Sequence, residues 1–318
     1  MGLFGFQALQ GTGCSDLGLR EQQRELNKDD RHAQGICDVL VETMKREHEL
    51  HVDPLTDFAI CCGQSEALAA ATFAIIDPGD HVLLFDPAYE TYQMCIELAR
   101  GVPVYVPLDP PSWTLNEDKF LESLTSWTKS GILNSPHNPT GKVFSKEELL
   151  IISKACHKMD CFAITDGVYE YITYDENKYI SLASLPGMQE RTIITSSLSK
   201  TDSVTASCAN ILGWRIGWVC AGANIAAAII NIHVKLTDSA PAPFQEAALI
   251  DFFLKKAALI ALTSTTDYYE SLKTDYVVRR DFILQFLKNY GFHISFERQG
   301  SIFVLAELPK SWKISDVR

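Results

Sequence analysis

Three motifs that mark nucleotide-binding and hydrolytic enzymes are absent from this 318-residue sequence. The sequence has no GxGxxG and no GxxxxGK[ST] string, which argues against a Rossmann dinucleotide site and a P-loop. It also lacks the GxSxG nucleophile elbow of the α/β-hydrolases. No CxxC pair or other paired zinc-ligand spacing occurs, so we expect no metal site.

Positive charge is also scarce. The 28 Lys and Arg residues against 40 Asp and Glu residues give a net charge of −12, a poor match for nucleic acid or an anionic membrane. No apolar run approaches the roughly 18–20 residues that span a bilayer. The N-terminal segment lacks the basic region and the long apolar stretch of a secretory signal. We therefore expect a cytoplasmic protein without nucleic-acid or membrane partners.

The cysteines give no sign of an oxidised framework. There are nine of them, an odd number, and most lie in apolar stretches. This pattern favours buried, reduced thiols over disulfide bonds or metal ligation.

Short apolar runs alternate with amphipathic ones from about residue 57 to residue 222. This predicts helices over 65–76, 89–100 and 145–159, with Ser65 and Ser145 as N-caps and Glu147 in the capping-box position. Strands are predicted over 57–63, 81–86, 102–108, 131–135, 161–166, 192–197 and 215–222. Such alternation predicts an α/β fold with a largely parallel sheet covered on both faces. Ligands of such sheets bind outside the carboxyl ends of the strands.

The pattern changes after about residue 260. Residues 264–290 predict one long amphipathic helix ending at Gly291, and segments 292–297 and 301–308 alternate like an antiparallel pair. We therefore predict a second, smaller α+β unit. The string AALI occurs at 247–250 and again at 257–260, and chance and a local insertion explain it equally well.

Two loops at predicted strand ends are candidate ligand sites. Gly63, Gln64 and Ser65 lie where a strand becomes a helix, and free backbone N–H groups at such a junction bind anions, although ordinary helix N-termini look the same. In the string NSPHNPTG, two prolines and a glycine fix the loop shape, so Asn138 is held rigidly at a strand end.

Two charged residues follow other predicted strands. Asp166 ends a buried apolar strand, with Tyr169 three residues later. A carboxylate there needs a partner, such as the protonated ring nitrogen of a cofactor, unless it is an ordinary N-cap. Lys200, in the string SLSK, can form a Schiff base if its amine is partly deprotonated, whereas an isolated lysine is usually a solvated charge.

The order of these strings identifies a resemblance. DPAYETY, NSPHNPTG, DGVY, SLSKT and GWRIGW follow one another as in the class I and II aminotransferases, which are pyridoxal-phosphate enzymes of fold type I. The resemblance runs from about residue 30 to 310 and is strongest to the branch with kynurenine, glutamine and methionine aminotransferases. It implies a homodimer and a role in amino acid metabolism.

The resemblance also implies a domain organisation. Residues 51–260 would form the large pyridoxal-phosphate-binding domain, with a mainly parallel sheet of the seven-stranded type. Residues 1–50 would be a divergent part of the small domain. Residues 261–318 would be a truncated remainder of that α+β small domain.

The resemblance assigns roles to the core of the site. Lys200 matches the lysine that holds pyridoxal phosphate as an internal aldimine and then moves the proton between the substrate and the cofactor. Asp166 matches the carboxylate that keeps the pyridine nitrogen protonated. Asn138 and Tyr169 match the pair that hydrogen-bonds the ring hydroxyl.

Further positions match the groups that hold the ring face and the phosphate. Tyr89 matches the aromatic residue that stacks on the ring. Ser197 and Arg215 match side-chain phosphate ligands. The turn of Gly63, Gln64 and Ser65 would supply backbone donors to the same phosphate.

The implied function is a pyridoxal-phosphate-dependent aminotransferase that moves an amino group from an amino acid to a 2-oxo acid. Two departures from the family pattern keep a catalytically impaired or non-catalytic relative as an alternative. The segment Ala206–Leu212 looks like an insertion between Lys200 and Arg215, and no arginine matches the one that grips the substrate carboxylate. Gly167, where the family has an acid, is a minor change. A C–S lyase, which uses the same Lys, Asp and Tyr groups, is a further alternative.

Overall fold

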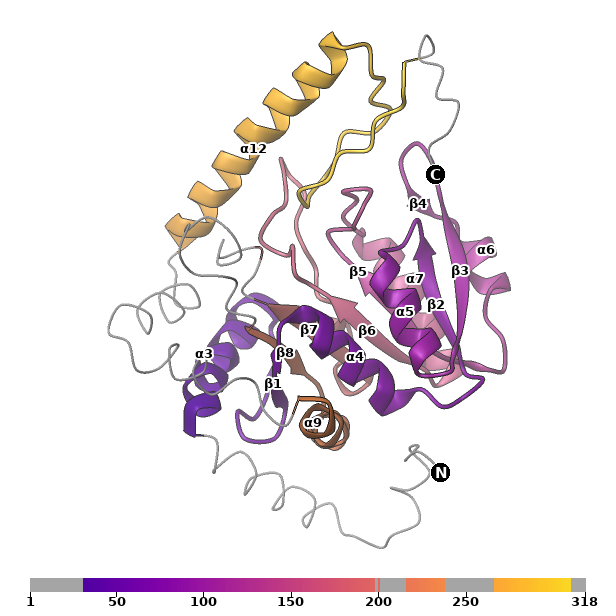
Figure 1. Cartoon of the computed structure of the whole chain (residues 1–318), viewed down its shortest axis with the longest axis vertical. Coiled ribbons are helices and arrows are strands. Elements are labelled where there is room, and N and C mark those ends of the chain that lie inside the picture. Colours follow the sequence, from indigo (N-terminus) through magenta and orange to yellow (C-terminus); the bar gives the residue numbers. More distant parts are fainter. Residues whose placement is uncertain (1–30, 198–199, 201–215, 238–265, 310–318) are drawn as a thin grey trace, which may run out of the picture.

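A computed structural model describes residues 31–197, 200, 216–237 and 266–309 (Figure 1). The AALI repeat, the segment Ala206–Leu212 and Arg215 lie outside these residues. The helices are α3 (Arg31–His48), α4 (Gln64–Ile75), α5 (Glu90–Leu98), α6 (Glu117–Glu122), α7 (Lys146–Met159), α9 (Ala223–Thr237) and α12 (Thr266–Asn289). The strands are β1 (Phe58–Cys62), β2 (His81–Asp86), β3 (Val102–Asp109), β4 (Thr114–Leu115), β5 (Thr128–Asn134), β6 (Phe162–Asp166), β7 (Thr192–Ser197) and β8 (Ile216–Cys220).

The described strands form one sheet in the order β1-β8-β7-β6-β5-β2-β3-β4. The central pairs β7-β6, β6-β5, β5-β2 and β2-β3 are parallel. Strand β8 runs antiparallel to both of its neighbours, β1 and β7, and the two-residue strand β4 is antiparallel to β3. The predicted mainly parallel α/β sheet is therefore confirmed. The carboxyl ends of β1, β2, β5, β6 and β7 lie along one edge.

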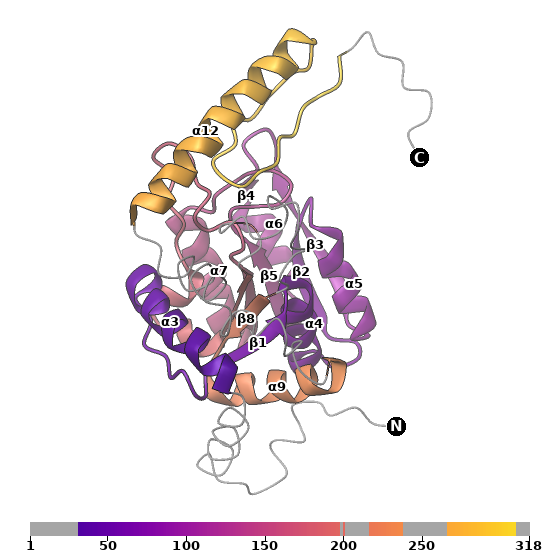
Figure 2. The same ribbon diagram turned by 60° about the vertical axis from the view of Figure 1, so that its left-hand side comes forward.

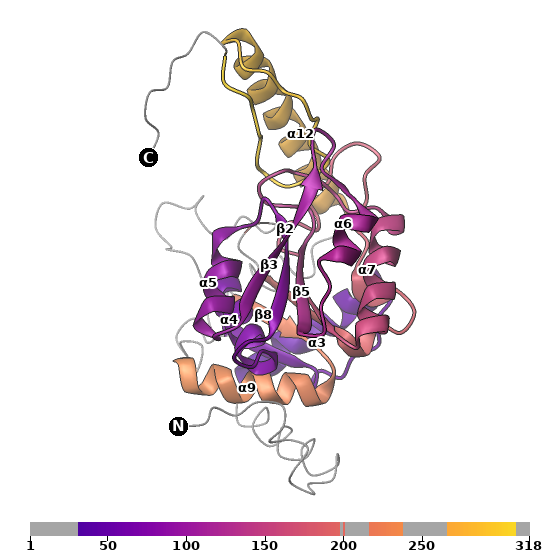
Figure 3. The ribbon, with the colours of Figure 1, turned by 90° about the vertical axis from the view of Figure 1, so that its right-hand side faces the viewer.

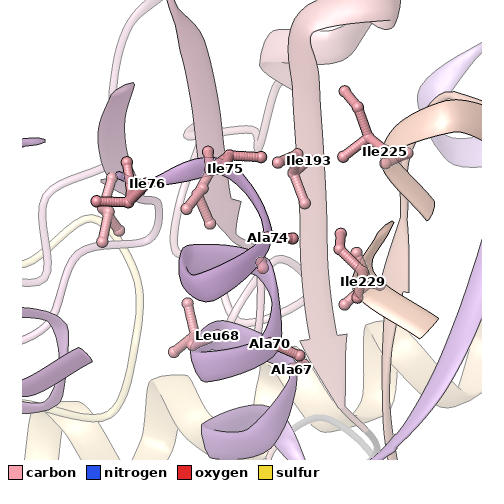
Figure 4. Close-up of a cluster of buried hydrophobic side chains, with 14 of the residues drawn as sticks. Ala67, Leu68, Ala70, Ala74, Ile75, Ile76, Ile193, Ile225 and Ile229 are labelled. Carbon is pink, nitrogen blue, oxygen red and sulfur yellow. The ribbon is translucent and has the colours of Figure 1, made fainter. Parts of the chain in front are cut away.

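Helices cover both faces of the sheet, as expected for parallel strands buried on both sides. Helices α4 and α5 lie on one face and α6 and α7 on the other (Figure 3). Apolar side chains of α4 and α9 pack against the middle strands (Figure 4). Helix α3 covers β1 and β8 on the face opposite α4 and α9, through Ile36, Leu40 and Met44. No described helix is both long and apolar enough to cross a membrane.

Two predicted helix starts need correction. Helix α7 has the capping box that its sequence suggests, but the acidic partner of Ser145 is Glu148 and not Glu147. The Ser145 hydroxyl accepts from the Glu148 N–H, and the Ser145 N–H donates to Glu148 Oε2. The partner must occupy the third helical position, and the helix begins at Lys146.

The N-cap of α4 is Gly63 and not Ser65, and no side chain caps this helix. The φ angle of Gly63 is 82°, in the left-handed region that favours glycine. The uncapped N–H groups at this helix start therefore remain available to an anion.

The small unit after residue 260 is only partly as predicted. Helix α12 ends before Gly291, as expected, and stands apart from the sheet (Figures 1 and 2). Within the described residues, however, the expected antiparallel pair of segments 292–297 and 301–308 is reduced to one isolated bridge, His293 to Glu307. Backbone groups of residues 299–301 pair with Gly141, Ile172 and Tyr174 instead, so they are not available to a second strand.

A buried ion pair joins α3 to the loop that follows β6. Nε2 of His48 lies 3.2 Å from Oε2 of Glu170, and both side chains are almost completely buried. Burial alone lowers the pKa of His48, but the Glu170 carboxylate outweighs this effect, and the pKa of the imidazole is raised. The pair fixes the end of α3 against the residue next to Tyr169.

We expect the stability that His48 contributes to depend on pH. Because the pKa of His48 is higher in the folded chain than the usual 6.5, its contribution is complete below that pH and is lost as the pH rises through the raised pKa. Urea unfolding from about pH 5.5 to about pH 9 would measure this contribution as the stability difference between wild type and His48→Gln. That difference should shrink with rising pH, and a constant difference would contradict the expectation. In a Glu170→Gln background the burial of His48 lowers its pKa, so the same stability difference should instead grow with rising pH.

Candidate functional site

A cavity of about 250 Å³ opens at the carboxyl edge of the sheet. Its lining combines polar, aromatic and charged side chains from the strand ends, from α4 and from the C-terminal unit: Gln64, Ser65, Leu68, Tyr89, Tyr92, Asn138, Asp166, Val168, Tyr169, Ser197, Lys200 and Phe303. Every candidate site residue named from the sequence therefore lines this cavity except two. Gly63 immediately precedes α4 beside it, and Arg215 lies outside the described residues.

Asp166 is the most deeply buried charge-bearing group of the cavity. Its Oδ2 accepts a 2.7 Å hydrogen bond from the Tyr92 hydroxyl, and its Oδ1 accepts from the Val168 N–H. Burial raises the pKa of Asp166, although hydrogen bonds from Tyr92, Val168 and the Gln64 side chain oppose the rise. The carboxylate thus has neutral donors around it in the described part of the chain, and a cationic partner would stabilise its charged form.

Tyr92 is a site residue that sequence reasoning missed. It lies one helical turn after Tyr89 in the string YETY, and the two rings meet edge to face with centroids 5.5 Å apart. Burial and the neighbouring Asp166 raise the pKa of Tyr92 well above its usual value, so its hydroxyl remains a donor at neutral pH. The sequence signal that could have identified Tyr92 is its spacing of three residues from Tyr89, which puts the two tyrosines on one face of a helix.

The loop that carries Asn138 is fixed by a chain of hydrogen bonds. Asn134, at the end of β5, accepts from the Asn138 N–H at 2.6 Å and donates to the Asp166 carbonyl at 3.0 Å. One buried side chain therefore sets the position of Asn138 relative to Asp166.

Next to Asn138, burial and the Lys142 charge lower the pKa of His137 to about 3. This imidazole is therefore neutral at physiological pH, and its Nδ1 hydrogen-bonds the Thr140 hydroxyl.

The turn at the start of α4 rests on a glycine of β8. A Cβ atom at Gly217 would lie 2.5 Å from the carbonyl carbon of Gly63 and 2.8 Å from the Gln64 nitrogen. Only a glycine allows this approach. The Gln64 side chain then reaches Thr195 Oγ1 at 2.8 Å, which ties the turn to β7. Gly217 was not predicted as a site residue, because its role depends on β1 and β8 being neighbours.

The two remaining aromatic residues shape the open side of the cavity. Tyr169 meets Phe303 edge to face, with ring centroids 5.8 Å apart. Phe303 comes from the C-terminal unit, so that unit contributes a wall to the cavity. Tyr89 keeps 38% of its surface exposed, as a residue offering its ring face to a ligand would. Burial and the Asp166 charge raise the pKa of Tyr169, which keeps its phenol protonated.

The chemistry of these residues fits pyridoxal phosphate. Asp166 is a fully buried carboxylate with neutral donors, and a protonated pyridine nitrogen would supply the missing cation. The side-chain oxygen of Gln64 is buried and has no hydrogen-bond partner among the described residues. The uncapped start of α4 offers backbone donors to an anion, and the Lys200 amine lines the same cavity.

Comparison with known proteins agrees with this chemistry. Residues 22–315 match the family described as aminotransferase class I and II, and the chain belongs to that family. It is 34% identical over 273 residues to the kynurenine–oxoglutarate transaminase of Dictyostelium discoideum, a match that covers 80% of this chain and 59% of that protein. It is 33% identical over 265 residues to the probable N-succinyldiaminopimelate aminotransferase DapC of Mycobacterium tuberculosis, a match that covers 83% of this chain and 62% of that protein.

Solved structures share the fold. The N-succinyldiaminopimelate aminotransferase of Mycobacterium tuberculosis superimposes with a TM-score of 0.77 at 30% identity, over 91% of this chain and 73% of that one. YbdL of Escherichia coli, described as having a methionine aminotransferase function, gives a TM-score of 0.76 at 27% identity, over 91% of this chain and 74% of that one. The predicted fold type I architecture is therefore confirmed. The chain spans about three fifths of the length of the curated relatives it matches.

Replacing Tyr92 by Phe should destabilise the protein by about 1.5–3 kcal/mol, because a buried carboxylate loses a hydrogen bond. The loss should be smaller at low pH, where Asp166 is protonated. Urea unfolding of the cofactor-free protein measures both effects. The matched control is Tyr105→Phe, which removes an exposed hydroxyl bonded to Gln93 and should change stability by less than about 0.5 kcal/mol. Equal losses in the two variants would contradict the role assigned to Tyr92.

Replacing Gly217 by Ala should displace the turn at the start of α4, because the new Cβ overlaps backbone atoms of that turn. We expect a loss of about 1–3 kcal/mol in unfolding free energy together with weaker binding of pyridoxal phosphate in a fluorescence titration. Gly131→Ala is the control, since a Cβ there meets its nearest neighbour, Leu83 Cβ, at an ordinary 3.6 Å. If Gly217→Ala leaves both quantities unchanged, the turn does not depend on this contact.

Proposed function

We propose that this chain is a pyridoxal-phosphate-dependent aminotransferase that transfers an amino group from an amino acid to a 2-oxo acid. The observation that carries the proposal is that Lys200 and the buried Asp166 line one cavity at the carboxyl edge of the sheet. They come from positions that the family's motifs assign to the cofactor-binding lysine and aspartate. Membership of the aminotransferase family supports the same reaction class.

Each part of the cofactor has residues suited to hold it. The phosphate would bind the turn of Gly63, Gln64 and Ser65, with Ser197 beside it and Arg215 as the proposed cationic ligand. The ring would lie against Tyr89. When bound, pyridoxal phosphate supplies an aldehyde carbon that bonds amines and a protonated ring that accepts the electron pair released at the substrate Cα.

Asp166 would keep a proton on the ring nitrogen of the cofactor. Its ionised form is costly in this buried position, so it gains most from a neighbouring positive charge. Tyr92 and Val168 orient the carboxylate through hydrogen bonds to its two oxygens. These two hydrogen bonds fix the orientation of the Asp166 carboxylate. Among the described residues, none of the groups that act on its pKa is a cation.

Tyr169 and Asn138 would hold the ring hydroxyl of the cofactor. The raised pKa of Tyr169 keeps its hydroxyl a donor at neutral pH, and Asn138 is held in place through Asn134. Both side chains would donate to the ring hydroxyl and orient the cofactor. Lys200 Nζ would take the proton from the substrate Cα as general base and deliver it to the aldehyde carbon of the cofactor as general acid.

The substrate class remains amino acids and 2-oxo acids. Names of relatives suggest kynurenine with oxoglutarate, or methionine, as the first substrates to try. Arg298 donates to the Phe303 carbonyl and lies over the Tyr174 ring, and Arg280 pairs with Asp175. These two arginines therefore hold the C-terminal unit in place, and we assign neither to the substrate carboxylate.

The proposal also includes a homodimer and a cytoplasmic location. The homodimer rests on the family resemblance, because class I and II aminotransferases build their sites between two subunits. The cytoplasmic location stays the expectation drawn from the sequence. The division into a large domain over residues 51–260 and flanking small-domain parts stays a prediction on the same grounds.

Lys200→Ala tests the function directly. Wild-type protein mixed with pyridoxal phosphate should gain a visible absorbance band, and borohydride reduction should fix the cofactor's mass on the peptide with Lys200. The variant should lose both signals and at least about 10³-fold in kcat/KM for transamination. The control is Lys154→Ala, which changes a lysine exposed on α7. A wild-type band without turnover for any amino acid would favour the non-catalytic alternative, and elimination products without amino transfer would favour the C–S lyase.

A further inference from the structure

Three metal-ligating side chains meet on the face of the sheet covered by α4 and α9. They are Cys61 from β1, Glu66 from the first turn of α4 and His233 from α9, and one donor atom from each lies within 4.8 Å of the others. The Cys61 side chain is fully buried, and those of Glu66 and His233 are about nine-tenths buried. Among the described residues no other group of three such side chains comes this close.

The cluster lies outside the cofactor cavity. At 100° per residue along α4, Gln64 and Leu68 point about 200° away from Glu66 around the helix, and these two residues line the cavity. Helix α9, which carries His233, packs against α4 and β1 (Figures 1 and 2), and none of the three side chains lines the cavity. The catalytic proposal makes no use of these three side chains.

We propose that Cys61, Glu66 and His233 form a binding site for one divalent transition-metal ion of the zinc class. A thiolate sulfur, a carboxylate oxygen and an imidazole nitrogen are the ligands such ions prefer. Bond lengths of about 2.0–2.3 Å in a tetrahedral site separate the donors by about 3.3–3.8 Å. The observed cluster reaches this spacing through side-chain movements of about 1 Å.

The Thr237 hydroxyl lies next to the three proposed ligands, where a tetrahedral ion would take its fourth ligand. Oγ1 of Thr237, one turn after His233 on α9, lies 3.2 Å from His233 Nδ1 and 3.5 Å from Glu66 Oε1. It can ligate the ion weakly or hold a water molecule that does. Thr237 is exposed, so the site also has an entry path from solvent.

The charges balance when a dication binds. In the metal-free protein, Glu66 accepts from His233 Nδ1 at 2.5 Å and from the Cys62 N–H. Burial raises the pKa of the Cys61 thiol well above its usual value, so this thiol is protonated without a metal. A dication would displace the thiol proton to solvent, leaving thiolate, carboxylate and neutral imidazole around the ion. No oxidation or reduction is involved, and affinity should rise with pH.

The competing explanation is a simple ion pair between Glu66 and His233 that holds α9 on α4, with Cys61 as a neutral core residue. The two explanations differ in what they require of Cys61. An ion pair needs no sulfur, whereas a metal site loses a ligand when Cys61 is replaced. Cys61→Ala therefore discriminates between them, and it removes a single buried atom without touching the ion pair.

The experiment uses the full chain, freed of metal with a chelator and titrated with Co²⁺ and then with Zn²⁺. We expect one equivalent of Co²⁺ to bind with the intense near-ultraviolet band of cobalt–thiolate ligation, and Zn²⁺ to displace it. Calorimetry in buffers of different ionisation enthalpy should show proton release on Zn²⁺ binding. Zn²⁺ should also raise the melting temperature of the metal-free protein by several degrees.

Cys61→Ala should remove the cobalt–thiolate band and weaken Zn²⁺ binding by at least about 100-fold, since even outer partners of metal ligands cost 10–100-fold. His233→Gln should weaken binding similarly. The matched control is Cys95→Ala, which removes another buried thiol, on α5, and should leave metal binding unchanged. Failure of the wild type to bind Co²⁺ or Zn²⁺ stoichiometrically would overturn the proposal. So would unchanged binding in Cys61→Ala, verified as folded by circular dichroism.

Discussion

The cavity depends on one buried carboxylate. Asp166 ends β6 at the centre of the sheet, and the groups that hold it come from four other places in the chain: Tyr92 from α5, Gln64 from α4, Val168 from its own loop and, through the Asp166 carbonyl, Asn134 from β5. Each donor is neutral, so the carboxylate is oriented but not neutralised by them. A buried, ionised carboxylate of this kind destabilises the folded chain unless a cation pairs with it. The family's cofactor carries such a cation at its protonated ring nitrogen.

The strand order explains why residues so far apart in sequence meet. Asp166 and Ser197 end β6 and β7, and Asn138 lies in the loop after β5. These three strands are neighbours in the sheet and run parallel. Their carboxyl ends therefore present three consecutive loops along one edge. Strand β8 is the exception in direction, and it places Gly217 opposite Ser197 and under Gly63. The antiparallel strand thus supports the turn proposed to bind the phosphate, while its own carboxyl end lies at the opposite edge of the sheet.

Sequence alone was enough for the mainly parallel sheet, for the approximate bounds of α4, α5, α7 and α12, and for most of the residues that line the cavity, because each was marked by a local string with a physical meaning. Helices α3, α6 and α9 were not predicted. It was not enough for contacts that exist only after the chain has folded. Tyr92 and Gly217 carried no motif of their own, since their roles are set by Asp166 and Gly63, which are distant in sequence. For the same reason the predicted strand pair over 292–297 and 301–308 is only partly formed, as one bridge between His293 and Glu307, while residues 299–301 bond the loops after β5 and β6. Alternation of apolar residues cannot reveal such a competing partner.

Helix α4 connects the proposed cofactor site with the cluster of Cys61, Glu66 and His233. Its first turn carries cavity residues on one side and Glu66 on the other, and the Cys62 N–H bonds the Glu66 carboxylate directly before the Gly63 turn. Two contacts therefore fix the position of that turn: the close approach of Gly217 on β8 to Gly63 and Gln64, and the hydrogen bond that the Glu66 carboxylate accepts from the Cys62 N–H. Because no side chain caps α4, these two contacts take over the task of fixing its start. An ion or an ion pair at Glu66 would thus act on the geometry of the phosphate site through one shared helical turn, without any contact with the cofactor itself.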